Sequence, residues 1–201
     1  MQVLILSKTK YGSHVCVGAM ELGSNKYLRL LNANGYYQDA DTPLNVGDIW
    51  DITYMVSRSI RKPHNEDVMV QTQIIVQKIN NLAEYIKNLS VPIWRGSIEN
   101  TFYGKLEWTS WGKGYISNEN SDIDHSVGFW LSDKPLTLQG DYYLYETNAF
   151  VHRQIKYKGI PEPKLIIPAN TLVRLSLAKW WKQDDDTEER CYMQLSGWYE
   201  S

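Results

Sequence analysis

The sequence has little of what marks several common protein classes. It contains only two cysteines, Cys16 and Cys191, too few for a disulfide framework or a four-cysteine zinc site. Its longest aliphatic run, residues 3–6, is far shorter than the roughly 20 residues of a membrane-spanning helix. The amino terminus lacks the basic segment and long apolar core of a secretory signal. These absences predict a cytoplasmic protein with reduced thiols and no membrane segment.

Motifs of common catalytic sites are missing as well. The sequence has no GxSxG nucleophile turn and no GxxxxGK[ST] phosphate-binding loop. Cys16 lies in the apolar segment HVCVG and is expected to be a buried structural thiol. We therefore predict a protein that is not an enzyme and that needs no cofactor.

Neither sign of charge dominates the chain. The net charge of −2 argues against a protein that coats duplex DNA by electrostatics alone. Residues 91–201 carry twelve basic and fifteen acidic residues, but five of these acids lie within residues 184–189. Without that acidic stretch the second half would have a net charge of +2. The balance leaves room for a basic groove beside a solvated acidic loop.

Aromatic residues, by contrast, are abundant. The chain has eight Trp and fourteen Tyr, and seven of the eight Trp follow residue 90. Large aromatic side chains fill the interior of small β-barrels, which is their commoner role. The same side chains provide stacking surfaces for bases or sugars.

Short alternating segments separated by turns predict a mostly β protein. Five strands are expected within the first 80 residues, which is typical of a small barrel. A helix is predicted over residues 81–89: Asn81 can cap it, with Glu84 three positions later. Its apolar face comprises Leu82, Tyr85, Ile86 and Leu89. The expected strands of the first half cover residues 3–9, 14–22, 27–31, 49–56 and 68–79.

The second half has shorter strand candidates and no comparable helix. We predict a domain boundary near residue 90, with a barrel and its linking helix in residues 1–90. Residues 91–201 are expected to form a Trp-rich β domain. The strand candidates of this half include residues 127–131, 142–145, 150–157, 165–167, 171–181 and 191–199.

Several segments resemble a bacterial family of dual OB-domain proteins. They are VLILSKT, GSHVCVGA, VGDIWDI and PHNEDV in the first half, and LVRLSLAKWW and CYMQLSGWY in the second. The resemblance implies an all-β fold of two OB-like small β-barrels joined by one short helix. It also implies binding of oligonucleotides, nucleotides or oligosaccharides, and an accessory role in prokaryotic defence systems. It supplies no catalytic residue.

The connection over residues 58–67 is the first candidate binding element. Arg58, Arg61 and Lys62 place three basic side chains within five positions, where they can contact phosphates. In an OB barrel the loop between the fourth and fifth strands flanks the binding face. The alternative is a solvated hairpin loop whose charges pair with one another.

Aromatic residues beside basic ones form the second candidate. Trp108 and Trp111 would face opposite sides of a regular strand, so that one of them leaves the core. Trp180 and Trp181 are neighbours in the sequence, so on a strand they would also face opposite sides. An exposed Trp beside a cation can stack a base and hold its phosphate, whereas the alternative is an interdomain packing cluster. The candidate residues are Trp94, Arg95, Trp108, Trp111, Lys113 and Tyr115.

Clusters of acids and histidines are weak candidates for a metal site. His64, Glu66 and Asp67 combine ligand types that suit Mg, Mn or Zn in a nuclease. Their spacing matches no constrained motif, and Asp67 can instead accept hydrogen bonds that shape a turn. We therefore predict no metal. A second cluster of the same kind comprises Asp122, Asp124 and His125.

Together these patterns predict a non-catalytic module that binds single-stranded nucleic acid or a nucleotide-type ligand. The module is interpreted as a recognition subunit of a prokaryotic defence system, with a protein partner in that system. Two alternatives stay open. The first is a protein–protein interaction subunit of a larger complex, and the second is a metal-dependent nuclease.

Overall fold

The structure is a computed structural model that describes residues 1–57, 61–119, 122–184 and 188–200. It divides into two compact units. Unit 1 comprises Met1–Val91 together with Tyr199 and Glu200, and unit 2 comprises Pro92–Trp198. No helix within the described ranges is long and apolar enough to cross a membrane.

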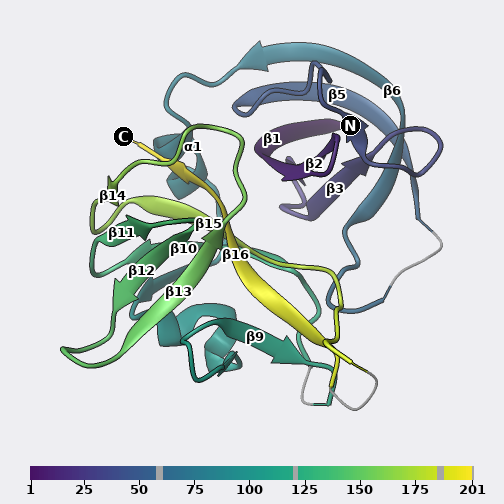
Figure 1. Cartoon of the computed structure of the whole chain (residues 1–201). Coiled ribbons are helices and arrows are strands. Elements are labelled where there is room, and N and C mark those ends of the chain that lie inside the picture. The colour runs from purple at the N-terminus through teal and green to yellow at the C-terminus, as the bar shows by residue number, and fades with distance from the viewer. Residues whose placement is uncertain (58–60, 120–121, 185–187, 201) are drawn as a thin grey trace. The chain divides into compact units, whose positions relative to one another are not determined.

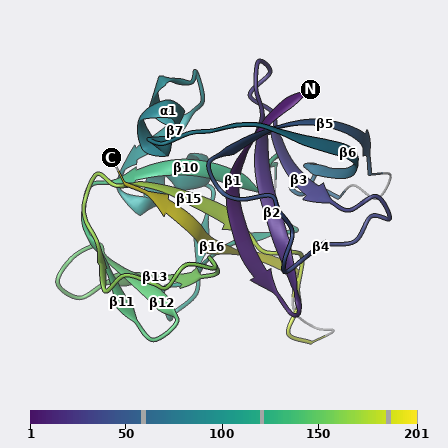
Figure 2. The same ribbon diagram turned by 90° about the horizontal axis from the view of Figure 1, so that it is seen from above.

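Unit 1 is a closed barrel of five strands with one short additional strand (Figure 1). The strands are β1 (Gln2–Tyr11), β2 (His14–Glu21), β3 (Tyr27–Leu31), β4 (Gln38–Asp39), β5 (Asp48–Val56) and β6 (Asp67–Lys78). Neighbours follow the order β1-β5-β6-β3-β2, and β2 pairs again with β1, which closes the ring. Figure 2 shows β1 and β2 side by side. Only β3 and β6 run parallel within this ring.

Side chains along the first half of β2 point alternately into the barrel and to its outer face. Val15, Val17 and Ala19 are buried in the core cluster of unit 1. Cys16, which lies between two of them, is only half-buried. The prediction of a buried structural thiol is wrong, because successive strand residues point to opposite faces and Cys16 belongs to the outer one.

The predicted helix is present as α1 (Leu82–Asn88) and belongs to unit 1. The backbone N–H of Glu84 donates to Asn81 Oδ1 at 3.1 Å, which caps the first turn. Ala83 and Ile86 are buried, so the apolar face packs inward as its spacing indicates.

Residue 199 also completes unit 1. The Tyr199 side chain is buried, and its hydroxyl donates to the backbone carbonyl of Leu6 at 2.7 Å. A buried carbonyl without a partner would cost free energy, so this bond matters for the barrel. The chain therefore begins in unit 1, passes through unit 2 and returns to unit 1.

Unit 2 contains a larger sheet around an aromatic core that includes Trp130, Tyr143 and Tyr145. The sheet path is β14-β11-β12-β13-β16-β15-β10-β7, and β9 pairs with both β8 and β16. The elements are β7 (Ile93–Gly96), a 3-10 segment η1 (Ile98–Gly104), β8 (Glu107–Trp108), β9 (Gly114–Ser117), β10 (Val127–Ser132), β11 (Leu136–Gln139), β12 (Tyr142–Glu146), β13 (His152–Tyr157), β14 (Ile166–Ile167), β15 (Leu172–Leu177) and β16 (Arg190–Tyr199).

The two units share one strand order. In unit 1, the start of β1 pairs with β5, and β1 also pairs with β2 from Val3 to Tyr11. In unit 2 the equivalent strand is divided: β10 pairs with β15, and β11, after residues 133–135, pairs with β12. β13 runs parallel to β16, as β3 does to β6. The all-β fold of two OB-like barrels is thus confirmed.

The prediction that Trp108 and Trp111 lie on one strand is wrong, and so is the same prediction for Trp180 and Trp181. β15 ends at Leu177, so Trp180 and Trp181 lie beyond it and their strand parity does not apply. Trp108 ends β8, and Trp111 lies in the turn before β9 rather than on the same strand. Trp111 is exposed because the chain reverses there, not because of alternation.

Candidate functional site

A cavity of about 840 Å³ lies in unit 2, on one face of the sheet. Residues of β12, β13 and β16 form its floor, and the β8–β9 turn and the β15–β16 connection border it. OB barrels bind their ligands on the face of the second and third strands, which in unit 2 are β12 and β13. The lining comprises Thr109, Ser110, Trp111, Lys113, Tyr142, Gln154, Lys156, Lys158, Ala178, Lys179, Trp181, Gln183, Arg190, Tyr192, Met193 and Gln194.

Strand register brings the floor residues together. Lys156 of β13 pairs with Tyr142 of β12 on one side and with Gln194 of β16 on the other. Paired residues point to the same face of a sheet, so these three side chains form a row across three strands. Gln154, two residues before Lys156, lies on the same face of β13.

The charged side chains in the described lining of the cavity are all basic. Lys113 Nζ lies 5.0 Å and Lys156 Nζ 5.7 Å from the ring centroid of Tyr142. Lys158, Lys179 and Arg190 add further cations to the lining. Among the lining residues in the described part of the chain there is no Asp or Glu. A concave surface lined by one sign of charge concentrates ligands of the opposite sign.

Two exposed tryptophans border the same cavity. Trp111 is 76% exposed and Trp181 is 53% exposed, whereas Trp130, Tyr143 and Tyr145 of the same unit are buried in its core. Trp181 is held in place by two backbone hydrogen bonds with Arg190, of 3.0 and 2.7 Å. Its ring centroid lies 6.2 Å from that of Tyr192. The cavity therefore combines cations with aromatic faces that a base or sugar can stack on.

Gly112 fixes the β8–β9 turn against β13. Its φ of +78° lies in the left-handed region, and a Cβ atom here would lie 2.3 Å from the carbonyl oxygen of His152. The N–H of Gln154 donates to the Gly112 carbonyl at 2.8 Å, and Lys113 forms a parallel bridge with Gln154. Only glycine permits this close approach. The contact sets the positions of Trp111 and Lys113 at the cavity edge.

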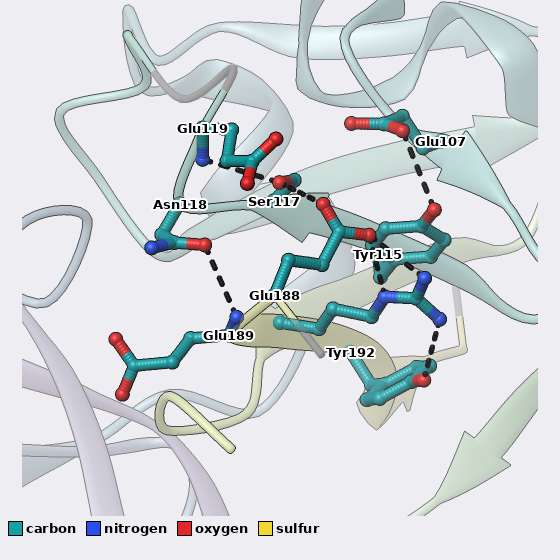
Figure 3. A network of polar contacts seen from close by, with 9 residues as sticks. Glu107, Tyr115, Ser117, Asn118, Glu119, Glu188, Glu189 and Tyr192 are labelled. Atoms are coloured by element: carbon teal, nitrogen blue, oxygen red, sulfur yellow. Dashed lines mark hydrogen bonds and ion pairs between the residues drawn. The ribbon is translucent and has the colours of Figure 1, made fainter. Parts of the chain in front are cut away.

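A polar network anchors one side of the cavity (Figure 3). Arg190 donates from Nε and Nη2 to the Glu188 carboxylate at 2.8 and 2.7 Å, and from Nη1 to the Tyr192 hydroxyl at 3.4 Å. Glu188 also accepts a hydrogen bond from Ser117, which with the Arg190 contacts lowers the pKa of this carboxyl. The Arg190 guanidinium lies 4.2 Å from the Tyr115 ring.

This network pairs one lining cation with an acid. Hydrogen bonding to Tyr192 and Glu188 raises the pKa of Arg190, and burial raises the pKa of Tyr115. The charge of Arg190 is therefore compensated by Glu188, which lies outside the lining. The other cations of the lining are Lys113, Lys156, Lys158 and Lys179.

The structure places only part of the sequence-predicted stacking set in this cavity. Trp111 and Lys113 line it, whereas Trp94, Arg95, Trp108 and Tyr115 do not. Trp94 packs against the core, with its ring 4.7 Å from Phe102. Trp108 is half-buried under the guanidinium of Arg153, at 4.2 Å. Tyr115 is buried, and Arg95 is exposed on β7.

The predicted basic loop belongs to unit 1. Arg58 lies outside the described residues. Arg61 and Lys62 are exposed, but they are not part of the unit 2 cavity. The sequence therefore named two basic regions, and the cavity of unit 2 includes residues of the second of them.

The two weak metal-site candidates do not form a metal-binding cluster among the described residues. His64, Glu66 and Asp67 are buried, and Asp67 accepts a hydrogen bond from the Arg29 guanidinium. In the second cluster, Asp122 pairs with Lys105, and His125 Nδ1 lies 2.9 Å from Asp124. Among the residues that the structure describes, no three His, Cys, Asp or Glu side chains gather in a way that would hold a metal ion.

Several lining residues were not predicted from the sequence. Local alternation in the segment HRQIKYK does mark Gln154, Lys156 and Lys158 as one face of a strand. It does not reveal their neighbours on β12 and β16, because that depends on pairing between distant segments. The unpredicted lining residues include Thr109, Ser110, Tyr142, Gln154, Lys156, Lys158, Gln183, Arg190, Tyr192 and Gln194.

Comparison with known proteins agrees with this geometry. Residues 1–198 match the family of dual OB-containing domains. The chain belongs to this dual OB family. No curated protein and no solved structure matches it. The family match covers both units and supports an OB-fold binding module, and unit 2 has a cavity on the face of β12 and β13.

Proposed function

We propose that this dual OB protein binds single-stranded nucleic acid in the unit 2 cavity, without chemical turnover. The main support for this proposal is that two exposed tryptophans and four lysines line one cavity, and that its described lining contains no carboxylate. Phosphate groups would lie against Lys113, Lys156, Lys158 and Lys179, because each cation displaces condensed counterions from the strand.

Bases would stack on Trp111 and Trp181. Stacking on an aromatic side chain requires an unpaired base whose face is accessible, which favours a single strand over a duplex. It contributes about 1–3 kcal/mol per base, which corresponds to roughly 5- to 150-fold in affinity. A nucleotide-type ligand would use the same two groups, with fewer phosphate contacts.

The test is fluorescence anisotropy with labelled single-stranded DNA, single-stranded RNA and duplex, titrated across salt. We expect saturable binding to single strands and a slope of log K against log salt of about −3, from roughly −0.7 for each of four lysines. Trp111→Ala should weaken binding 5-fold or more, and Lys156→Ala should make the slope less negative by about 0.7.

Matched controls lie elsewhere on the chain. Phe150→Ala removes an aromatic side chain that is 95% exposed in unit 2 but does not line the cavity. Lys87→Ala removes an exposed cation from α1. Both should bind like the unmodified protein. Absence of binding at tens of micromolar, roughly the weak end of non-specific affinity, would contradict the proposal.

The same samples test the non-catalytic part of the proposal. Oligonucleotides incubated with the protein and Mg²⁺ or Mn²⁺ should stay intact on a denaturing gel. Cleavage that His64→Ala abolishes would instead favour the metal-dependent nuclease.

We also propose the finer role that the sequence resemblance implies, a recognition subunit of a prokaryotic defence system. In that role a partner protein would respond to the strand bound by unit 2. Affinity purification with and without a single-stranded oligonucleotide should then retain a partner whose binding changes with the oligonucleotide, and that change should be lost in Trp111→Ala. A partner retained equally in both conditions would favour the interaction-subunit alternative.

A further inference from the structure

The lining of the unit 2 cavity places glutamines next to lysines. Lys156 of β13 pairs with Gln194 of β16, and Gln154 of β13 forms a parallel bridge with Lys113. Each glutamine therefore has a lysine as its neighbour across the sheet, on a strand about 5 Å away. Gln154 and Lys156 are two residues apart on one strand, so their side chains leave the same face. Lys156 thus adjoins both glutamines.

The two glutamine amides are available to a ligand. Both side chains line the cavity and are half-buried. Neither side-chain amide forms a hydrogen bond with another described residue. The bond from Gln154 to the Gly112 carbonyl, of 2.8 Å, uses the backbone N–H and leaves the side chain unused. An amide without a partner in the protein must find one in water or in the bound molecule.

An amide and an ammonium group suit different parts of a nucleotide. An ammonium group has only donors, which match the acceptor oxygens of a phosphate. An amide has donors and also an acceptor oxygen, and a phosphate diester has no proton to offer to that oxygen. A ribose 2′-hydroxyl both donates and accepts, so it matches the amide, whereas deoxyribose has no such group.

The position of the glutamines favours the sugar as their partner. In the proposed function the phosphates lie against lysines that include Lys113 and Lys156, and the bases stack on Trp111 and Trp181. The 2′-hydroxyl is carried by the carbon next to the one that bears the 3′ phosphate. The hydrogen-bonding edge of a base lies farther from that phosphate. A glutamine that adjoins a phosphate-binding lysine is therefore placed to meet the hydroxyl.

We propose that the unit 2 cavity selects RNA over DNA, by hydrogen bonds between the amides of Gln154 and Gln194 and ribose 2′-hydroxyls. This inference rests on the proposed function, because the lysines must hold the phosphates of the strand. One net hydrogen bond corresponds to roughly 2- to 12-fold in affinity. Two such bonds predict that RNA binds about 5-fold tighter, or more, than DNA of the same sequence.

The experiment compares oligouridine with oligodeoxyuridine, which differ only in the 2′-hydroxyl, by fluorescence anisotropy with the full chain. The RNA should bind about 5-fold tighter or more. A 2′-fluoro strand keeps the sugar conformation of RNA but lacks the hydroxyl proton, and it should bind like the DNA. A 2′-fluoro strand that binds like the RNA would assign the preference to sugar conformation and would overturn the proposal.

Substitution of the glutamines locates the contact. Gln154→Leu and Gln194→Leu should each lower the ratio of RNA affinity to DNA affinity roughly 2-fold or more, and should leave the DNA affinity unchanged. Gln2→Leu, at an exposed site of β1 outside the lining, should change neither affinity. A preference for RNA that survives both cavity substitutions would contradict the role of the glutamines.

The outcomes separate this inference from the function on which it rests. Equal binding of the two strands, or tighter binding of the DNA, would overturn the selection of RNA and would leave the single-strand site in place. Absence of binding by both strands at roughly tens of micromolar protein would overturn the proposed function as well.

Discussion

At the scale of single residues, the cations of the unit 2 cavity differ in what surrounds them. Arg190 is paired with Glu188, whereas Lys113 and Lys156 lie near the ring of Tyr142. An arginine that shares its charge with a carboxylate gains less from a phosphate than a lysine that faces only aromatic carbon. On the proposed function, the affinity for a single strand should therefore depend on Glu188 as well as on the cations themselves.

Replacement of Glu188 tests this directly. Glu188→Gln keeps the shape of the side chain and removes its charge, which leaves Arg190 available to a phosphate. We expect tighter binding of single-stranded DNA and a salt slope more negative by about 0.7, measured by anisotropy. Glu162→Gln, an acid outside the lining, should change neither quantity. Weaker binding in Glu188→Gln would show that the Glu188 pair positions Arg190 for the ligand instead.

At the scale of elements, the β8–β9 turn depends on its contact with β13. Gly112→Ala would place a Cβ atom 2.3 Å from the His152 carbonyl oxygen and would force the turn away from the strand. Trp111 and Lys113 would move with it, although neither side chain is altered. We expect affinity for single strands to fall at least as far as in Trp111→Ala, measured by the same titration.

Gly140 provides the control for this substitution. It also has a positive φ, of +59°, but a Cβ atom there would contact nothing within 4 Å. Gly140→Ala should therefore cost only the conformational penalty of about 1 kcal/mol and should leave binding intact. Equal loss of affinity in both variants would mean that destabilisation, and not the position of the turn, causes the effect.

Alternation in the sequence predicts single elements better than their neighbours. Tyr27–Leu31 is a strand as expected, and Asn81 caps the predicted helix. The pairing of Lys156 with Gln194 was not predictable, because a parallel pairing between distant segments has no local signal. For the same reason the sequence indicated Trp111 and Lys113 together but did not place Tyr142 beside them.

At the scale of the whole molecule, each unit contains one tyrosine with a strongly shifted pKa. Burial raises the pKa of Tyr37 in unit 1 to about 12, and burial together with the nearby Tyr143 raises the pKa of Tyr157 in unit 2 to about 12. An unfolded tyrosine loses its proton near pH 10. Between pH 10 and 12 the folded protein retains these protons while the unfolded chain releases them, so deprotonation favours unfolding.

Alkaline pH should therefore weaken both units. The free energy of unfolding, measured by urea titration, should be unaffected by these tyrosines below pH 10 and should fall as the pH rises toward 12. Tyr37→Phe and Tyr157→Phe should each reduce this fall, whereas Tyr36→Phe, at a site 70% exposed, should not. A fall of the same size in all three variants would assign the alkaline effect to other groups.

The position of Tyr199 has a consequence for biosynthesis. The ribosome makes β1 to β6 first, but the hydroxyl that bonds the Leu6 carbonyl emerges only after all of unit 2 has been translated. During synthesis, β1 to β6 can therefore leave the exit tunnel before the residue that forms this hydrogen bond, which follows about a hundred residues of unit 2. Unit 2 is thus synthesised between the two parts of unit 1.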